Sequence, residues 1–305
     1  SSGRRAAIIA DLVPDAGENR VCAVARRVLD RIRPVPPNTC IVWTGLKGNA
    51  EYIEAGGKKA IPFLPEHYRR WVAELLDTGG RGLDISAACA SSTVGLAIGA
   101  QKIAREEYRS VLVCAADVVT GFAAAGFSAL KALTASACRP FDRARDGMCV
   151  GDGAAALLLA DAKTADDCKL DRLAQVLGWG IATDAIHITG PARDGRGLVA
   201  ATEMAMGMAG MPPDDVQAFC AHGTGTVFND GMELAAIETV YGNRLFPIFS
   251  IKGAIGHTLG AAGGIDAAIS VHALAQKRVP PTVGLKTPEA KAVGRVSNRT
   301  QAFDG

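Results

Sequence analysis

Residues 82–104 read "GLDISAACASSTVGLAIGAQKIA", a pattern of strand, tight turn and helix. Residues 83–86 are few and include the apolar Leu83 and Ile85, which predicts a short buried strand. Small residues follow around one cysteine, and after residue 92 the apolar positions recur at helical spacing along one face. Ser91 and Ser92 stand where the N-cap of that helix is expected. Units of this kind are typical of α/β proteins.

Cys89 lies in the turn, at or just before the start of the expected helix. The unpaired N–H groups and the dipole of a helix N-terminus favour a thiolate over a thiol. The residues around Cys89 are small, so a substrate carbonyl could approach the sulfur closely. This pattern is typical of a nucleophile elbow with sulfur in place of oxygen. The alternative is a structural cysteine, because free cysteine is among the most buried residue types.

The composition excludes several other classes of protein. The 305 residues are 49% hydrophobic and 21% charged, which indicates a globular chain with a large core. A net charge of only +2 argues against a dedicated nucleic-acid binder. No apolar run approaches the length of a membrane span, and no signal peptide is evident. The eight cysteines lack metal-ligand spacing, so we interpret them as reduced thiols in a cytoplasmic protein and expect no metal or organic cofactor.

Strand-like and helical runs alternate along the chain. Residues 110–117 and 173–180 are strand-like, for example, and residues 263–276 are helical. The alternation predicts an α/β protein in which helices pack on layered sheets. Each half of the chain places a potentially reactive residue in a small-residue turn between a strand and a helix. We therefore expect residues 1–165 and 166–305 to be two similar halves of one integrated domain.

Two of the five histidines lie at the ends of expected strands. His222 opens "HGTGT", and His257 lies within "KGAIGHTLGAAGG", again between a strand and a helix. Strand ends are where α/β proteins usually assemble their sites. Lys252 shares a turn with His257 and several glycines. Core packing alone gives no reason for so many glycines beside a lysine and a histidine, which favours a functional site.

Four motifs, in one order, resemble the β-ketoacyl synthases of fatty-acid and polyketide assembly. They are "AACASS", "ACRPFDRARDG", "HGTGTVFND" and "IKGAIGHTLGAAGG". His222 follows Cys89 by 133 residues, and His257 follows His222 by 35 residues. The chain is similar to the elongating branch of the family, which has a Cys-His-His site. The resemblance implies a thiolase-type α/β fold of two similar halves with layered sheets and helices (αβαβα).

The resemblance also implies roles for individual residues. Cys89 matches the acylated nucleophile, and His222 and His257 match the pair that acts on the extender thioester. Lys252 matches the buried lysine beside the second histidine. A lysine in that place would disfavour protonation of the histidines and keep them neutral.

Asp230 and Glu233 match an acidic pair that supports the site in the family, where the glutamate is usually linked to the lysine. The same two residues also fit a capping box, with Asp230 as N-cap and Glu233 at the third helical position. Both interpretations stay open at this point, and Glu233 could serve both purposes. Residues 139–147, "RPFDRARDG", are expected to be structural, with their arginines paired to nearby aspartates.

The implied activity is a decarboxylating Claisen condensation of an enzyme-bound acyl group with malonyl-acyl carrier protein, which gives 3-oxoacyl-acyl carrier protein. The implied partners are acyl carrier protein and a second subunit, in a homodimer or in a heterodimer with a related chain. An acidic carrier protein would need a basic patch. The candidates for this patch are Lys131, Arg139, Arg143 and Arg145.

Three alternatives are less favoured. A thiolase uses a second cysteine as base, and no equivalent glycine-rich turn of this sequence carries one. An initiating synthase pairs its cysteine with histidine and asparagine, whereas the third residue here is His257. A non-catalytic or impaired partner subunit is the third. It is favoured by one departure from the family, whose glycine-rich final segment supplies an oxyanion-hole N–H, whereas here the last residues are "VSNRTQAFDG". Either the sequence is part of a longer product, or this is a shortened member that lacks part of its oxyanion hole, for which losing one such donor would cost about 100- to 1000-fold in rate.

Overall fold

The computed structural model describes residues 6–15, 18–46, 48–56, 64–187 and 189–304. Within them, the first half of the chain forms a four-stranded sheet. Its strands are β2 (Cys40–Thr44), β3 (Gly82–Ile85), β4 (Ser110–Asp117) and β6 (Gly153–Ala160). They lie in the order β3-β2-β4-β6, and only β6 runs antiparallel to its neighbour. Both central strands are buried along their whole length, as expected for strands covered on both faces.

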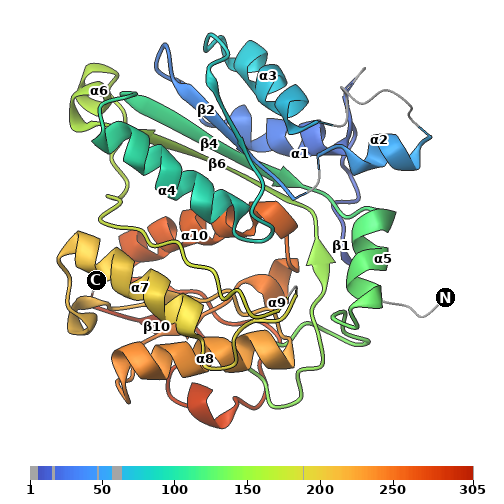
Figure 1. Ribbon diagram of the computed structural model, residues 1–305, viewed down its shortest axis with the longest axis vertical. Helices are drawn as coiled ribbons and strands as arrows, with labels where there is room; N and C mark the ends of the chain where they lie inside the picture. The colour runs from blue at the N-terminus through green and yellow to red at the C-terminus, as the bar shows by residue number, and fades with distance from the viewer. Residues whose placement is uncertain (1–5, 16–17, 47, 57–63, 188, 305) are drawn as a thin grey trace.

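Helices cover both faces of this sheet (Figure 1). On one face lie α1 (Arg20–Leu29) and α3 (Pro65–Leu76), with a core that includes Trp43 and Tyr68. On the other face lie α4 (Ser91–Ala104) and α10 (Ala262–Gln276). A Cβ at Gly95 of α4 would come within 2.7 Å of the Thr44 side chain, so glycine at this position allows the close approach of helix and sheet.

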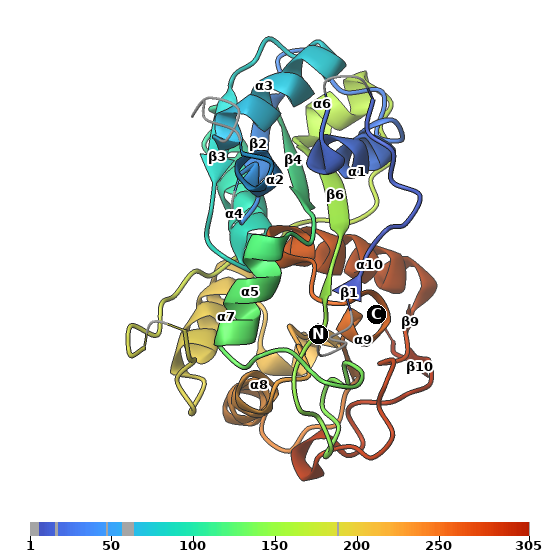
Figure 2. The same ribbon diagram turned by 90° about the vertical axis from the view of Figure 1, so that its right-hand side faces the viewer.

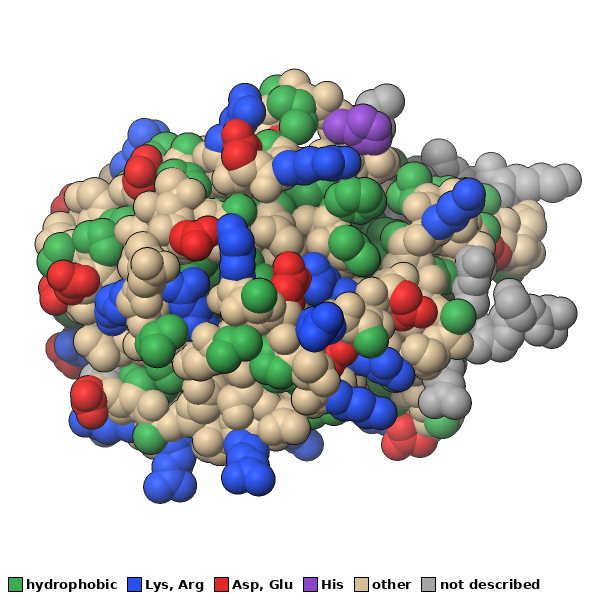
Figure 3. All heavy atoms as spheres, turned by 90° about the horizontal axis from the view of Figure 1, so that it is seen from below, with side chains coloured by type: hydrophobic (Ala, Val, Ile, Leu, Met, Phe, Trp, Pro, Cys, Tyr) green, Lys and Arg blue, Asp and Glu red, His purple; other side chains and the backbone are tan. Residues whose placement is uncertain are grey.

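The second half adds the remaining layers. Strands β7 (Phe219–Cys220) and β8 (Ile248–Phe249) pair in parallel, and α10 contacts both β6 and β7. Helix α7 (Arg196–Ala209) packs against α8 (Val227–Tyr241) on the outside. Figure 2 shows α10 across the middle of the molecule, below the strands of the first sheet, and Figure 3 shows that the lower face mixes acidic, basic and apolar side chains. The layered α/β arrangement expected from the sequence is confirmed.

The shorter elements complete the chain. Two-residue strands form the pairs β1 (Ala6–Ala7) with β5 (Val150–Gly151) and β9 (Arg278–Val279) with β10 (Gln301–Ala302). The short helices are α2 (Ala50–Glu54), α5 (Gly121–Ala129), α6 (Ala162–Asp167) and α9 (Lys252–Ile255). One-turn 3₁₀ helices span Pro213–Asp215, Leu259–Ala261 and Ala290–Ala292.

Two expectations about strands were wrong. Strand β3 exists, but it is not buried, because it lies at the edge of the sheet and leaves Leu83 37% exposed. Residues 173–180 form no strand and pair with no strand in the described chain. The main chain at Gly178 instead lies on α7, where a Cβ would come within 2.2 Å of the Ala205 carbonyl oxygen, and Leu177 is half exposed.

Candidate active site

The turn that carries Cys89 connects β3 to α4. Ala88, just before the cysteine, has φ of +49°, a left-handed conformation that is uncommon for a residue with a side chain. The Ser91 hydroxyl holds this turn, since it accepts a hydrogen bond from the Ala87 N–H at 2.9 Å and donates one to the Ala88 carbonyl at 2.6 Å. The sharp strand-to-helix turn places Cys89 directly before the helix, as a nucleophile elbow requires.

The expectation that Ser91 and Ser92 cap the helix was wrong. Helix α4 begins at Ser91, and Ala90 occupies the N-cap position without a side-chain hydrogen bond. Both serines are fully buried, and Ser91 bonds within its own turn instead. Ser92 donates to the Gly260 carbonyl and accepts from the Gly264 N–H, each at 2.8 Å, and so joins α4 to the second half of the chain.

The thiol of Cys89 is half buried, and all eight cysteines of the chain are free. Burial raises the pKa of Cys89, and the positive charge of Lys252 opposes this rise. The net direction is opposite to the thiolate expected from the helix N-terminus alone. Desolvation outweighs the favourable charges here, because an apolar surrounding disfavours the ionised sulfur.

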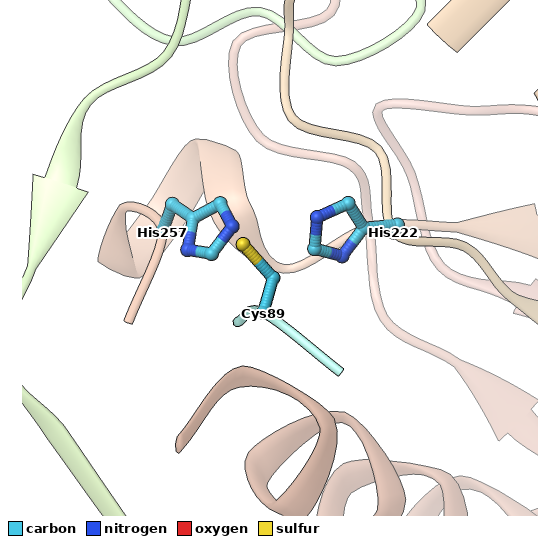
Figure 4. A group of neighbouring side chains, drawn as sticks. All are labelled: Cys89, His222 and His257. Carbon is cyan, nitrogen blue, oxygen red and sulfur yellow. The ribbon is translucent and has the colours of Figure 1, made fainter. Parts of the chain in front are cut away.

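His222 and His257 face the sulfur from two elements of the second half. His222 follows β7, and His257 follows α9. The two imidazole rings lie edge to face, with centroids 5.0 Å apart and planes at 85°. The Cys89 sulfur and one nitrogen of each ring all lie within 4.8 Å of one another, and Figure 4 shows the cysteine side chain rising between the rings. A single small substrate group at this point would touch all three.

Both histidines are held in the neutral form. Burial, the charge of Lys252 and the neighbouring His257 lower the pKa of His222 well below its ordinary value. Burial and Lys252 lower the pKa of His257 to about 3. The effect expected of Lys252 is therefore present, although burial is the larger cause. The Leu259 N–H donates to Nδ1 of His257 at 2.9 Å, so the neutral ring carries its proton on Nε2.

Lys252 is 1% exposed, and its Nζ donates to Oδ2 of Asp266 at 2.9 Å. The link between Lys252 and Glu233 expected from the resemblance is not formed. Asp266 lies one helix away, on α10, and no motif pointed to it. The sequence signal that could have indicated it is an acidic residue 14 positions after Lys252, on the helix that follows the turn of His257.

Glu233 supports His222 through the backbone. Its two carboxylate oxygens accept from the N–H groups of His222 and Gly223, each at 2.6 Å, and from the Asn229 amide at 2.8 Å. Burial, together with the charge of Asp230, raises the pKa of Glu233 to about 7. The residue therefore fixes the turn that carries His222.

Of the two interpretations left open for Asp230 and Glu233, the capping box is wrong. Helix α8 begins at Val227, and its N-cap is Thr226. Asp230 is fully buried inside the first turn, where it accepts from the N–H groups of Phe141 (2.8 Å) and Gly225 (3.1 Å). It ties the "HGTGT" turn to the "RPFDRARDG" segment.

The C-terminal part of the "RPFDRARDG" segment, around Arg145, is structural. Arg145 is buried, forms an ion pair with Glu289 and lies 3.7 Å from Asp230. Arg145 is thus unavailable for docking, which corrects its place among the basic candidates. Lys131 and Arg143 are exposed.

Cys89, His222 and His257 also form the one group in the described part of the chain whose donor atoms come close enough to share a metal ion. The buried cation of Lys252 beside them would repel a metal. Among the described residues, no helix is both long and apolar enough to cross a bilayer.

Comparisons with known proteins agree with this geometry. The family models of the β-ketoacyl synthase N-terminal and C-terminal domains match residues 60–165 and 173–286. The chain is 34% identical over 270 residues to 3-oxoacyl-[acyl-carrier-protein] synthase 2 of Staphylococcus aureus (strain COL), which covers 83% of this chain and 65% of that relative. The chain thus spans less than two thirds of the length of the curated relatives it matches.

Solved structures agree on the fold. A β-ketoacyl synthase from Burkholderia phymatum STM815 superposes with a TM-score of 0.86 at 24% identity, over 98% of this chain and 82% of that one. The ishigamide ketosynthase/chain length factor superposes with a TM-score of 0.84 at 27% identity, over 96% and 78%. The fold is therefore the thiolase-type fold of condensing enzymes. The chain belongs to the β-ketoacyl synthase family.

Proposed function

We propose that this protein is an elongating ketosynthase. It condenses an acyl group held on Cys89 with malonyl-acyl carrier protein to give 3-oxoacyl-acyl carrier protein, in fatty-acid or polyketide synthesis. The observation that carries the proposal is the convergence of the Cys89 sulfur with two neutral imidazoles within 4.8 Å. An acyltransferase of this kind needs a sulfur nucleophile and donors for a developing oxyanion at one point, and this site offers both.

The first step is acyl transfer. Cys89 loses its proton, and its sulfur attacks the carbonyl carbon of the acyl thioester. The thioester bond to the carrier protein breaks, and the released carrier thiolate takes up a proton. Because burial raises the pKa of Cys89, the thiolate is a minor form at neutral pH, and the nearby charge of Lys252 favours it.

The second step is decarboxylation and condensation. The malonyl thioester loses CO₂, and the two electrons of that C–C bond become an enolate. The Nε2–H of His257 and the ring of His222 stabilise the enolate oxygen by hydrogen bonding. The enolate carbon attacks the acyl-cysteine carbonyl, and the Cys89 thiolate leaves and regains a proton. Neutral imidazoles suit this role, because the reaction requires hydrogen-bond donation rather than proton removal from carbon.

The supporting residues act through position and charge. Lys252, paired with Asp266, keeps a positive charge beside the histidines and disfavours their protonation. Glu233 holds the backbone at His222. We further propose that residues 1–165 and 166–305 work as two halves of one domain, supported by the hydrogen bond between the His257 N–H and the Cys149 carbonyl at 2.7 Å.

The partners follow from the same chemistry. The curated relative acts, by its name, on acyl carrier protein, and we propose this carrier as the donor of both thioesters. Exposed Lys131 and Arg143 are candidates for its docking. The edge strand β3 offers a route to a dimer by strand pairing, either with a second copy or with a related subunit. A cytoplasmic location, where thiols stay reduced, fits the eight free cysteines.

The test is the intact mass of the protein after incubation with an acyl-carrier-protein thioester. We expect the wild type to gain one acyl group, and Cys89→Ala to gain none. Cys168→Ala, which removes another half-buried thiol, is the matched control and should acylate normally. Adding malonyl-carrier protein should then release the acyl group as a 3-oxoacyl product. A folded wild type without a mass gain would refute the catalytic proposal in favour of a non-catalytic partner subunit.

A further inference from the structure

Gly260 lies three residues after His257 and is held from two sides by the first half of the chain. Its carbonyl accepts from the Ser92 hydroxyl at 2.8 Å, and its N–H donates to Asp117 at 2.9 Å. We propose that Ser92 and Asp117 are positioning residues, which clamp Gly260 and thereby fix the tautomer and placement of His257.

Ser92 lies in the first turn of α4, the helix that follows the turn of Cys89. It lies three residues after Cys89 and is fully buried. Its hydroxyl uses both of its functions on the His257 side of the site, since it donates to Gly260 and accepts from the Gly264 N–H, also at 2.8 Å. The serine therefore sets the distance between the start of α4, which directly follows the turn of Cys89, and the start of α10.

Asp117 is the last residue of β4 and is 2% exposed. One oxygen, Oδ2, accepts from both the Gly260 N–H and the Leu46 N–H, the latter at 2.7 Å. The fit around Gly260 is close, because a Cβ there would lie 2.7 Å from the Leu46 nitrogen and 2.8 Å from Asp117. The Gly260 peptide is thus fixed against the ends of two strands of the main sheet.

The clamp at Gly260 acts on His257 through the backbone N–H of Leu259. Leu259, between the clamp and the histidine, has φ of +56° and is fully buried. A leucine rarely adopts this left-handed conformation, so surrounding contacts must hold it. In this conformation the Leu259 N–H donates to Nδ1 of His257. Releasing Gly260 would let Leu259 relax, and Nδ1 would lose the donor that keeps the proton on Nε2.

The effect of the clamp on catalysis rests on the proposed condensing function, whereas its effect on the tautomer of His257 does not. We would therefore measure the tautomer directly by ¹⁵N NMR of protein labelled in its histidine rings, with the His257 signals identified by their loss in His257→Gln. The wild type should show only the Nε2–H form of His257. Ser92→Ala should show a second tautomer, and so should Asp117→Leu, whereas Asp117→Asn keeps an acceptor oxygen and should restore most of the wild-type signal.

The control is Ser110→Ala. Ser110 is also a buried serine of the first half, and its hydroxyl bonds to that of Thr39 at 2.7 Å, at the opposite end of β4 from Asp117. This variant should lose stability as Ser92→Ala does, without a change in the His257 signals. If Ser92→Ala and Asp117→Leu, shown to be folded by the rest of their spectra, keep the single wild-type tautomer, the proposal is wrong.

Kinetics separate this inference from the proposed function. In an active enzyme, Ser92→Ala should lower kcat at least about 10-fold with KM little changed, since a 1 Å misplacement costs on the order of 100-fold. A tautomer change in a protein that never acylates would support the clamp and refute the condensing function. An active Ser92→Ala enzyme with unchanged kcat would refute an effect of the clamp on catalysis and leave the condensing function standing.

Discussion

The buried pair Lys252–Asp266 allows a prediction with a worked magnitude. Lys252 is 1% exposed, whereas the Asp266 side chain keeps 16% of its surface, and one ion pair of 2.9 Å joins them. Removing one partner of a buried ion pair costs about 3–5 kcal/mol of unfolding free energy. Asp266→Leu should fall at the upper end, because it leaves a fully buried ammonium unpaired. Lys252→Met should cost less, because burial already raises the pKa of Asp266, so the remaining carboxylate can take up a proton and become neutral.

The double variant, which carries both substitutions, tests the pairing itself. Its loss should be smaller than the sum of the two single losses by about 2 kcal/mol or more, because no unpaired charge remains. Urea unfolding followed by circular dichroism at pH 7 measures all three. As a matched control, replacing the exposed pair Lys163–Asp167 by alanines should cost no more than about 1 kcal/mol. Single losses that add within about 0.5 kcal/mol in the double variant would refute the reasoning.

Three further predictions concern the second half of the site. Glu233→Gln should cost about 1–3 kcal/mol and weaken activity, because the new amide group would face one of the two backbone N–H donors, at His222 or the next residue; urea midpoints and acylation rates measure this. Gly253→Ala should abolish soluble folded protein or its activity, since a Cβ would lie 1.8 Å from the Val283 carbonyl oxygen; expression and acylation yield decide. Burial lowers the pKa of His257 to about 3, so between pH 6.5 and pH 3 the unfolded chain binds more protons at this residue than the folded chain does. Acidification over this range should therefore lower the free energy of unfolding of the wild type, and should lower that of His257→Gln less. Unfolding measured at each pH tests this.

Much of the fold could be predicted from local patterns. Strand β4 spans Ser110–Asp117, the same residues as the predicted apolar run, because a strand buried on both faces is a continuous apolar segment. What could not be predicted was the lateral place of each strand. The short run at 83–86 looks like a core strand, yet β3 is an edge. Residues 173–180 have strand composition, but strand formation also requires a neighbour to pair with.

The site shows the same division. Cys89 and the two histidines stand out because few other side chains perform their chemistry and because small residues surround them. Their supporting groups do not stand out. Asp266, Ser92 and Asp117 act through single tertiary hydrogen bonds, and such bonds have no sequence period. Asp230 illustrates the risk of local patterns, since its apparent capping box is in fact a buried tie to the Phe141 N–H.

The interleaving of the two halves has a consequence for folding. Cys89, the proposed nucleophile, comes from the first half and the two histidines come from the second, and hydrogen bonds cross between α4, β4 and the Leu259–Ala261 turn. Neither half contains a working subset of these groups. Contacts so distant in sequence close late and slow the search for the native state. The proposed acylation of Cys89 should therefore report order across the whole chain, and its loss in denaturant should track global unfolding rather than fraying of any one segment.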